Sequence, residues 1–232
     1  MRLSAALLGA MAVVTQTAGQ STTVPIAPGV DMPIVNLGGV TEAPGNYTLF
    51  LELGGRGLDT ALSYGTATQE QVGAAIHSGI VPRDEIFVTT KVMCCPRAKT
   101  PSQCTTYPNL TIAEQVDRDL KELGIDQIDL LLLHWPCITD EDTGQRYLEL
   151  EEALASNKTR AIGVSNFEIK HYKAIENAGA TVKPAVNQCA MSIGLHDDET
   201  IEFSIEHNIT YQVGYVLQRL SFSTHVNNML RI

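Results

Sequence analysis

The stretch that decides the fold of this 232-residue chain is Gly57-Leu58-Asp59-Thr60-Ala61-Leu62-Ser63-Tyr64-Gly65. Its apolar start is typical of a short buried strand, and Gly65 permits the sharp turn that follows. Asp59 is then expected near the carboxyl end of that strand, with Tyr64 in the turn beyond it. In parallel α/β folds, functional residues gather at this end of the strands. We therefore expect the stretch to carry part of a functional site.

Two further strand patterns end in an ionisable side chain. The run Ile86-Phe87-Val88-Thr89-Thr90-Lys91 ends in an amine, and the run Ile128-Asp129-Leu130-Leu131-Leu132-Leu133-His134 ends in an imidazole. Taken singly, such side chains have ordinary roles, such as a turn cap, a strand-end charge or a core histidine. An acid, a phenol, an amine and an imidazole at the ends of successive strands together favour a proton-transfer site.

The rest of the chain alternates between helix and strand patterns, and its apolar strands suit burial on both faces of a parallel sheet. Thr111 and Glu114 form a capping-box pattern that begins one helix, and Gly124 ends it. The patterns predict helices at 47–53, 70–76, 112–123, 147–155, 169–178 and 200–206, and strands at 34–37, 57–59, 86–91, 128–134, 161–164 and 185–188. This order indicates an α/β barrel class.

Five segments resemble the aldo-keto reductases in their order and spacing. They are Leu58-Asp59-Thr60-Ala61, Tyr64-Gly65, Thr90-Lys91, Leu133-His134-Trp135-Pro136 and Gly163-Val164-Ser165-Asn166-Phe167. The resemblance runs from about residue 32 to residue 212 and implies a (β/α)8 TIM barrel of aldo-keto reductase type. The barrel is expected to be incomplete, with about six to seven βα units present. A small hairpin at 30–34 is expected to cap its bottom.

The resemblance implies a role for each of four residues. A tyrosine has a reference pKa of roughly 10, and a nearby ammonium group lowers it. By resemblance, Tyr64 is the proton donor, Lys91 tunes it, Asp59 is the partner of Lys91, and His134 orients and polarises the carbonyl.

Reduction of a carbonyl needs a nicotinamide cofactor, because no side chain supplies a hydride. The resemblance implies that this cofactor is NADPH. The resemblance implies that Ser165, Asn166 and Gln188 hydrogen-bond the nicotinamide carboxamide. It also implies that Gly38 and Gly39 let the cofactor approach the backbone. The alternatives are a helix cap at 165–166 and an ordinary turn at 38–39.

The expected activity is therefore the NADPH-dependent reduction of aldehydes or ketones to alcohols, with a small carbonyl compound as the substrate. Beyond Gln212 the sequence does not resemble the family, and the last strand and the adenosine-phosphate residues of the family are not found. The expected division is a signal peptide at 1–19, a partial barrel at 20–212 and a divergent tail at 213–232. Activity is accordingly expected to be impaired. The alternative is a non-catalytic, degenerate barrel that binds a ligand or is inactive.

Composition excludes other classes of function. A net charge of −10 argues against a nucleic-acid partner, and a hydrophobic fraction of 44% argues against a multi-span membrane protein. No cysteine spacing matches a zinc site, because Cys94 and Cys95 are adjacent and no second pair completes the ligands. No metal is expected.

The amino-terminal residues predict export. Arg2 precedes an uncharged apolar or small run at 3–14, and Thr17-Ala18-Gly19 is a small-residue cleavage pattern. We expect a secreted or secretory-pathway protein; the alternative is a cytoplasmic protein with a leader that does not function. Asn-X-Ser/Thr sequons occur at Asn46, Asn109, Asn157 and Asn208.

Three of the five cysteines lie in an insertion at 92–110. It follows a strand at the expected catalytic end, so it either overhangs the substrate site or is an ordinary surface loop held by a disulfide. Export predicts a disulfide within it, between Cys95 and Cys104. The odd number of cysteines leaves at least one thiol free if all pairing is internal.

Overall fold

In the computed structural model, the described residues are 22–39, 46–95, 104, 110–192 and 196–214. The expected signal peptide, tail residues 215–232, the Asn109 sequon and most of the insertion lie outside them. Of the helices in the described ranges, none combines the length and apolar character needed to cross a bilayer.

The core of the described chain is one parallel sheet whose strands pair in chain order. Its strands are β3 (Asn36–Gly38), β4 (Gly57–Asp59), β5 (Phe87–Val92), β6 (Ile128–Leu133), β7 (Thr159–Ser165), β8 (Val186–Ala190) and β9 (Thr210–Gly214). Every residue of β5 and β6 is buried, as expected for strands covered on both faces. Because all strands run the same way, their carboxyl ends meet at one end of the molecule.

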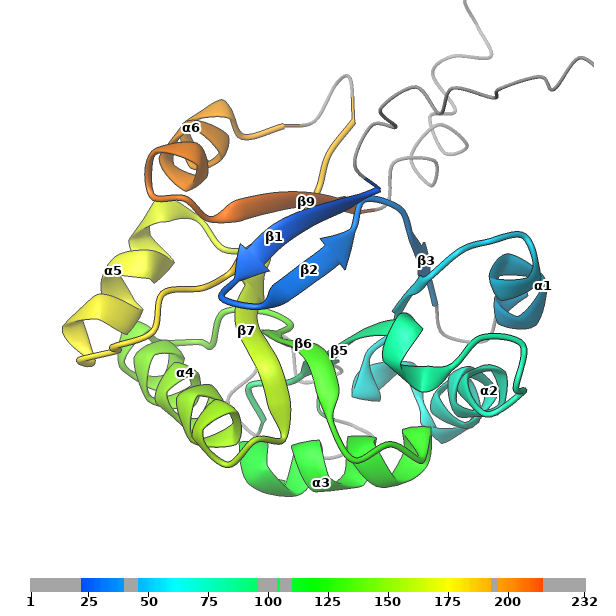
Figure 1. Cartoon of the computed structure of the whole chain (residues 1–232). Helices are drawn as coiled ribbons and strands as arrows, with labels where there is room; N and C mark the ends of the chain where they lie inside the picture. Colours follow the sequence, from blue (N-terminus) through cyan, green and yellow to red (C-terminus); the bar gives the residue numbers. More distant parts are fainter. Residues whose placement is uncertain (1–21, 40–45, 96–103, 105–109, 193–195, 215–232) are drawn as a thin grey trace, which may run out of the picture.

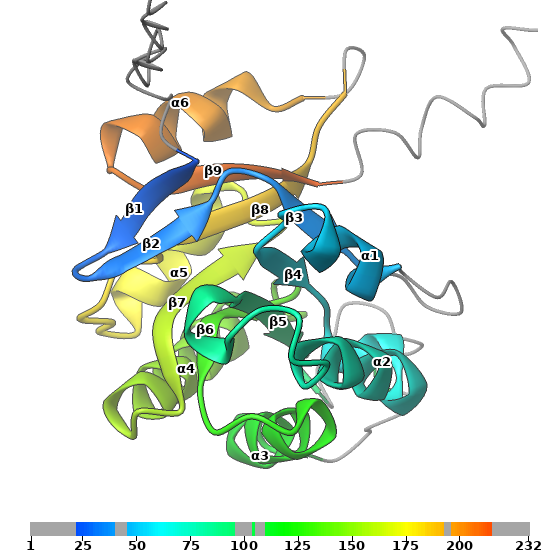
Figure 2. The ribbon, with the colours of Figure 1, turned by 45° about the vertical axis from the view of Figure 1, so that its right-hand side comes forward.

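Helices surround this sheet, and Figures 1 and 2 show them as a ring outside the strands. They are α1 (Tyr47–Glu52), α2 (Thr66–Ile76), α3 (Ile112–Leu123), α4 (Asp140–Ala155), α5 (Ile169–Asn177) and α6 (Asp198–Glu206), with short 3-10 turns η1 (Leu62–Tyr64) and η2 (Arg83–Glu85). The sequence prediction of an incomplete parallel α/β barrel is confirmed by this arrangement. In the described part of the chain no ladder joins β3 to β9, which are the edges of the sheet.

Local signals explain where the helices begin. The Thr111 hydroxyl accepts a hydrogen bond from the main-chain N–H of Glu114, and the Glu114 carboxylate accepts one from the main-chain N–H of Thr111. These two hydrogen bonds confirm the predicted capping box. The predicted start of α4 at residue 147 is wrong, because Thr139 caps that helix instead. The acidic residues at 140–142 stabilise this first turn through the helix dipole, although they carry no apolar periodicity.

A hairpin closes the amino-terminal end of the barrel. Its strands β1 (Thr23–Ala27) and β2 (Val30–Pro33) are antiparallel, and Figure 2 shows them lying across that end. Val30 and Met32 pack against apolar side chains of β5 to β8. Arg160 of β7 donates to the Gly29 carbonyl at 2.9 Å and pairs with Asp129 of β6. The chemistry is therefore expected at the opposite, carboxyl-terminal end.

The first barrel strand is shorter than predicted. Ile34 and Val35 are 59% and 68% exposed, and β3 begins only at Asn36. The Ile34 N–H donates to the Thr22 carbonyl at 2.9 Å, so this residue continues the hairpin instead of the barrel. Its β-branched side chain suited both possibilities, and the hairpin contact decides between them.

Candidate active site

A buried ion pair lies at the carboxyl ends of β4 and β5. Lys91 is 1% exposed, and its Nζ lies 2.5 Å from Asp59 Oδ1. The same ammonium donates to the Thr60 carbonyl at 2.9 Å. The register pairs Asp59, the last residue of β4, with Thr89 of β5. Lys91 therefore lies two positions farther along β5 than the level at which β4 ends, and its side chain reaches back to the carboxylate. The pairing predicted for these two residues is confirmed.

Tyr64 and His134 complete a cluster with this ion pair. The Lys91 Nζ lies 5.5 Å from the centroid of the Tyr64 ring. The Tyr64 and His134 rings meet edge to face, with their centroids 5.8 Å apart. Tyr64 comes from η1, which follows β4 directly, and His134 comes directly after β6. Three separate strand ends thus bring the four residues together, as the sequence predicts.

The surroundings of His134 favour the uncharged form of its ring. Burial lowers the pKa of its imidazole well below the usual value, and the positive charge of Lys91 lowers it further. Its Nδ1 lies 3.2 Å from the Ser63 Oγ. Its main-chain carbonyl accepts from Asn166 Nδ2 at 3.0 Å. The ring therefore has one N–H, and its main chain is held by the next strand end.

The three residues predicted to hold the cofactor lie together beside this cluster. Ser165 Oγ donates to the Gln188 carbonyl at 2.8 Å, and Asn166 Nδ2 donates to Ser165 Oγ at 3.0 Å. Gln188 Nε2 donates to Asp59 Oδ2 at 2.6 Å, so the group touches the ion pair directly. The alternative of a helix cap at 165–166 is wrong, because Glu168 and His171 cap α5.

The free hydrogen-bond acceptors of this group fit a primary carboxamide. The amide nitrogens of Asn166 and Gln188 are used by neighbouring oxygens. Among the described residues, no group donates to the side-chain oxygen of either amide. Two such acceptors at adjacent strand ends suit the NH₂ group of a nicotinamide carboxamide.

Gly39 has a packing reason for its lack of a side chain. Its N–H donates to the Asp59 carbonyl at 2.7 Å, which holds it beside β4. An added Cβ would lie 2.5 Å from the Tyr47 hydroxyl. This contact explains the glycine without a cofactor, and the predicted cofactor role of Gly39 stays a prediction.

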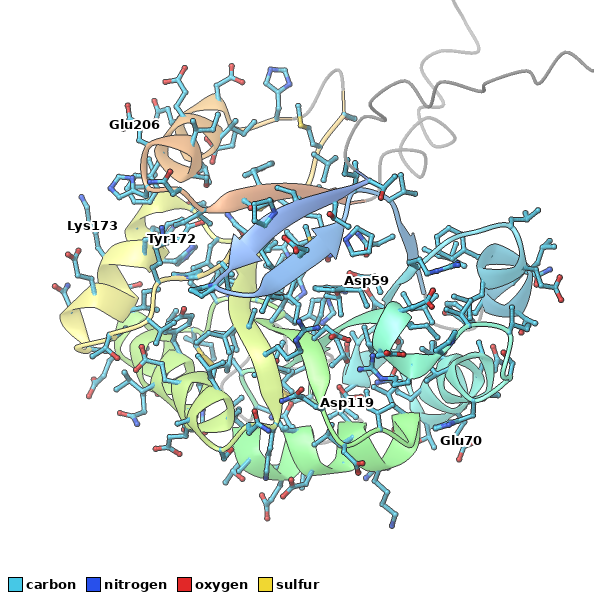
Figure 3. All side chains as sticks on the ribbon, viewed as in Figure 1. Asp59, Glu70, Asp119, Tyr172, Lys173 and Glu206 are labelled. Atoms are coloured by element: carbon cyan, nitrogen blue, oxygen red, sulfur yellow. A yellow bond between two sulfur atoms is a disulfide. The ribbon has the colours of Figure 1, made fainter. Side chains whose placement is uncertain are left out.

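Behind the ion pair lies a buried network that the sequence analysis missed. The Asp119 carboxylate of α3 accepts hydrogen bonds from Thr90 Oγ1 at 2.5 Å and from the Gln69 amide nitrogen. The amide oxygen of Gln69 in turn accepts a hydrogen bond from the Thr60 hydroxyl. Figure 3 places the labelled Asp119 on α3 and Asp59 within the ring of helices. Burial raises the pKa of Asp119 to about 7, against the opposing effect of these hydrogen bonds. A signal existed, because Asp119 follows the apolar Val116 at helical spacing.

Two disulfides lie next to the site. Cys95–Cys104 confirms the predicted bond. Cys94–Cys137, which was not predicted, joins the segment after β5 to the segment after β6. Cys189 has a free thiol. The Cys94–Cys137 bond thus links the chain just beyond Lys91 to the chain just beyond His134.

The model of the Aldo/keto reductase family matches residues 42–224 of this chain. The chain belongs to the aldo/keto reductase family. The match continues beyond Gln212, where the divergent tail was expected to begin, and β9 likewise includes Val213 and Gly214.

Relatives with assigned names are similar over most of this chain. An aldo-keto reductase of Mycobacterium marinum is 34% identical over 185 residues, which cover 78% of this chain and 61% of the relative. The glycerol 2-dehydrogenase (NADP(+)) of Saccharomyces cerevisiae is 35% identical over 180 residues, covering 66% of this chain and 53% of the relative. The chain thus spans 53% to 61% of the length of these relatives.

Solved structures of family members share the fold. An aldo/keto reductase from Brucella melitensis superposes with a TM-score of 0.70 at 27% identity, covering 88% of this chain and 77% of that one. A Bombyx mori aldo-keto reductase in complex with NADP superposes with a TM-score of 0.69 at 26% identity, covering 85% and 67%. The predicted barrel of aldo-keto reductase type is confirmed.

Proposed function

We propose that this site reduces aldehydes or ketones to alcohols with NADPH. The observation that carries the proposal is the buried Lys91, which pairs with Asp59 and lies against the ring of Tyr64 beside a neutral His134. The names of the relatives support it, since the yeast protein is an NADP(+) dehydrogenase and the silkworm structure contains NADP. The proposed substrate is a small carbonyl compound.

Each residue of the cluster has a distinct part in the proposed reaction. The bound nicotinamide would supply the hydride that the carbonyl carbon needs. The Tyr64 hydroxyl gives its proton to the carbonyl oxygen, and the nearby charge of Lys91 favours the phenolate that remains. Asp59 holds the ammonium in place. The neutral His134 donates its N–H to the carbonyl oxygen and orients it.

We propose that Ser165, Asn166 and Gln188 hold the nicotinamide carboxamide. The free side-chain oxygens of Asn166 and Gln188 are the acceptors, and Ser165 Oγ fixes the Asn166 amide. The position of the group beside Asp59 would place the ring next to the proton donor. Orientation of this kind lowers the barrier because it replaces a chance encounter with a fixed geometry.

We further propose that residues 1–232 alone catalyse the reaction weakly. The support is the open sheet, in which β3 and β9 have no partner strand on one side within the described residues. An open barrel holds its strand ends less firmly than a closed one. The non-catalytic alternative, a degenerate barrel that binds a ligand, predicts no turnover by this chain. Because weak turnover is difficult to distinguish from none, a test that separates the two is needed.

The test is a chimera in which residues from Val213 onward are replaced by the corresponding carboxyl-terminal part of the Mycobacterium marinum relative. We expect it to oxidise NADPH when aldehydes are added, and the Tyr64→Phe chimera to be slower by at least about 100-fold. Cofactor fluorescence should show unchanged NADPH binding in that variant. Equal turnover by the chimera and its Tyr64→Phe variant would show that Tyr64 is not the proton donor. A folded chimera that binds NADPH without turnover would favour the non-catalytic alternative.

We propose that the protein enters the secretory pathway. The disulfides Cys94–Cys137 and Cys95–Cys104 support this, since such bonds persist in oxidising compartments. Expression in a secreting host should give a product in the medium that begins at Gln20. A cytoplasmic product that retains its first residues and has five free thiols would contradict export.

A further inference from the structure

Ser63 is the residue of η1 next to Tyr64, and it faces His134 from the same turn. Its Oγ lies 3.2 Å from His134 Nδ1. Two main-chain hydrogen bonds fix this turn: Tyr64 N–H to the Ala61 carbonyl at 2.9 Å, and Gly65 N–H to the Leu62 carbonyl at 3.1 Å. The serine and the tyrosine are therefore presented to the imidazole as one rigid unit.

The main chain of His134 is held independently of its ring. Its N–H donates to the Val92 carbonyl at 2.9 Å, and its carbonyl accepts from Asn166. Neither contact chooses between the two tautomers of a neutral imidazole. The hydrogen bond at Nδ1 does, because a protonated Nδ1 leaves Nε2 as an acceptor, whereas an accepting Nδ1 leaves Nε2 as a donor.

The surroundings of Ser63 favour the second arrangement. A serine that accepts from a protonated Nδ1 needs another acceptor for its own hydroxyl proton. Within the described residues, the Ser63 hydroxyl has no hydrogen-bond partner other than His134. The side chain is partly buried, and solvent is the alternative acceptor for that proton. Donation from Oγ to Nδ1 satisfies both groups.

We propose that Ser63 is a positioning residue that donates to His134 Nδ1 and so keeps the proton on Nε2, where it can be donated to the substrate carbonyl. The tautomer assignment rests on the contacts of Ser63 and on the burial of His134, and it does not depend on the proposed function. Its catalytic consequence rests on the proposed function. An imidazole with an unprotonated Nε2 would present a lone pair to the carbonyl oxygen and would repel it.

The test observes the tautomer directly in the cofactor-free chain. Imidazole nitrogens of the full chain are labelled with ¹⁵N in its six histidines, and long-range ¹H–¹⁵N correlation spectra are recorded near neutral pH. A His134→Gln variant assigns the signals. We expect the Nε2-protonated pattern for His134 in the wild type. Ser63→Ala should give a mixture of tautomers, and Ser63→Thr, which keeps the hydroxyl, should restore the wild-type pattern.

Ser78→Ala is the matched control, since that hydroxyl donates to the Ala75 carbonyl at the end of α2 and has no contact with His134. It should leave the His134 signals unchanged. A wild-type His134 protonated at Nδ1, or an unchanged tautomer in Ser63→Ala, would overturn the proposal. Thermal melts of each variant check that the fold is intact.

The catalytic half is tested separately in the active chimera described above. Ser63→Ala is expected to lower kcat about tenfold, the effect of one ordinary hydrogen bond, with little change in KM. Ser63→Thr should recover most of that loss. If the spectra are as expected but the kcat of Ser63→Ala is unchanged, the proposed effect of the tautomer on catalysis is wrong. If no form turns over, the proposed function fails while the tautomer assignment stands.

Discussion

At the scale of single residues, Gly39 and Tyr47 form a tight pair beside the site. The Tyr47 hydroxyl is buried and has no hydrogen-bond partner among the described residues. Burial raises the pKa of this phenol, and the Asp59 carboxylate raises it further. A Cβ on Gly39 would lie 2.5 Å from the same hydroxyl. The pair is therefore sensitive to any gain in volume at position 39.

Gly39→Ala is expected to lower the free energy of unfolding by about 1–3 kcal/mol, the usual cost of overpacking. Tyr47→Phe should relieve the contact, and alone it should be neutral or stabilising because it removes an unpaired buried hydroxyl. Urea unfolding of both single variants and the double variant measures the coupling. Strictly additive effects would show that the two groups do not meet.

The sequence predicts the four site residues because residue type and strand position coincide at Asp59, Tyr64, Lys91 and His134. It does not predict Ser63, whose partner lies 71 positions away in the chain. A hydroxyl in a turn has many possible partners, and only the folded distance chooses among them.

At the scale of elements, α3 brings a buried carboxylate up to the back of β4 and β5. Asp119 is fully buried, and Gln69 of α2 and Thr90 of β5 are its hydrogen-bond donors. The charged groups that act on it are Glu122, which raises its pKa, and Lys91, which lowers it. Burial dominates and raises the pKa to about 7.

This shift predicts a pH-dependent stability. Between about pH 4 and pH 7 the unfolded chain releases the Asp119 proton while the folded chain keeps it, so stability falls as pH rises. The total effect is at most roughly 4 kcal/mol, since each pKa unit corresponds to about 1.4 kcal/mol. Asp119→Asn should flatten this slope and gain stability at pH 8 relative to wild type. Urea titrations at pH 5 and pH 8 measure it, and parallel slopes in both proteins would contradict the assignment.

One of the two disulfides joins the segments that follow neighbouring strands β5 and β6. Cys94–Cys137 closes a loop of 43 positions, and its loss is expected to cost about 2–4 kcal/mol through the freedom that the unfolded chain regains. The double variant Cys94→Ser/Cys137→Ser is compared with Cys189→Ser, which removes a free thiol. Peptide mapping without reduction should find both bonds in the wild type. A pairing of Cys94 with Cys104 would contradict the assigned connectivity.

Element boundaries show where sequence patterns are insufficient. Helix α3 is predicted to the residue, since its capping box and its terminal glycine, at φ 69°, are local signals. The start of α4 is not predicted, because its polar first turn has no apolar periodicity. The start of β3 is not predicted either, because the exposed β-branched pair Ile34 and Val35 suits both the hairpin and the barrel strand. The Cys94–Cys137 disulfide was not predicted because Cys137 lies outside the insertion, 43 positions from its partner.

At the scale of the whole molecule, the sheet has two unpaired edges within the described residues. β3 and β9 each pair on one side only within the described chain. Unpaired strand edges present free donors and acceptors and favour pairing with another copy. The order of the strands followed from the alternating pattern of the sequence, but whether the first and last strands meet depends on curvature that no local pattern contains.

We therefore expect the 232-residue chain to associate at micromolar concentration. Val213→Lys on β9, where the side chain is 40% exposed, should reduce association because a charge on an edge strand opposes pairing. Leu53→Lys is the control, because this residue is 79% exposed, follows α1 and belongs to neither edge strand. Sedimentation velocity compares the three proteins. Equal effects of both lysines would indicate a general charge effect, and a monomeric wild type would contradict the expectation.

The hairpin β1–β2 also determines the order in which the molecule is completed. Its residues leave the ribosome early, yet Val30 and Met32 pack on β5 to β8. The hydrogen bond from Arg160 to the Gly29 carbonyl spans 131 positions. Contacts of such large sequence separation form late in folding. During synthesis the hairpin therefore stays exposed to solvent until Val186 has left the ribosome. The hairpin that closes the amino-terminal end of the barrel is thus made first but packs against the barrel late.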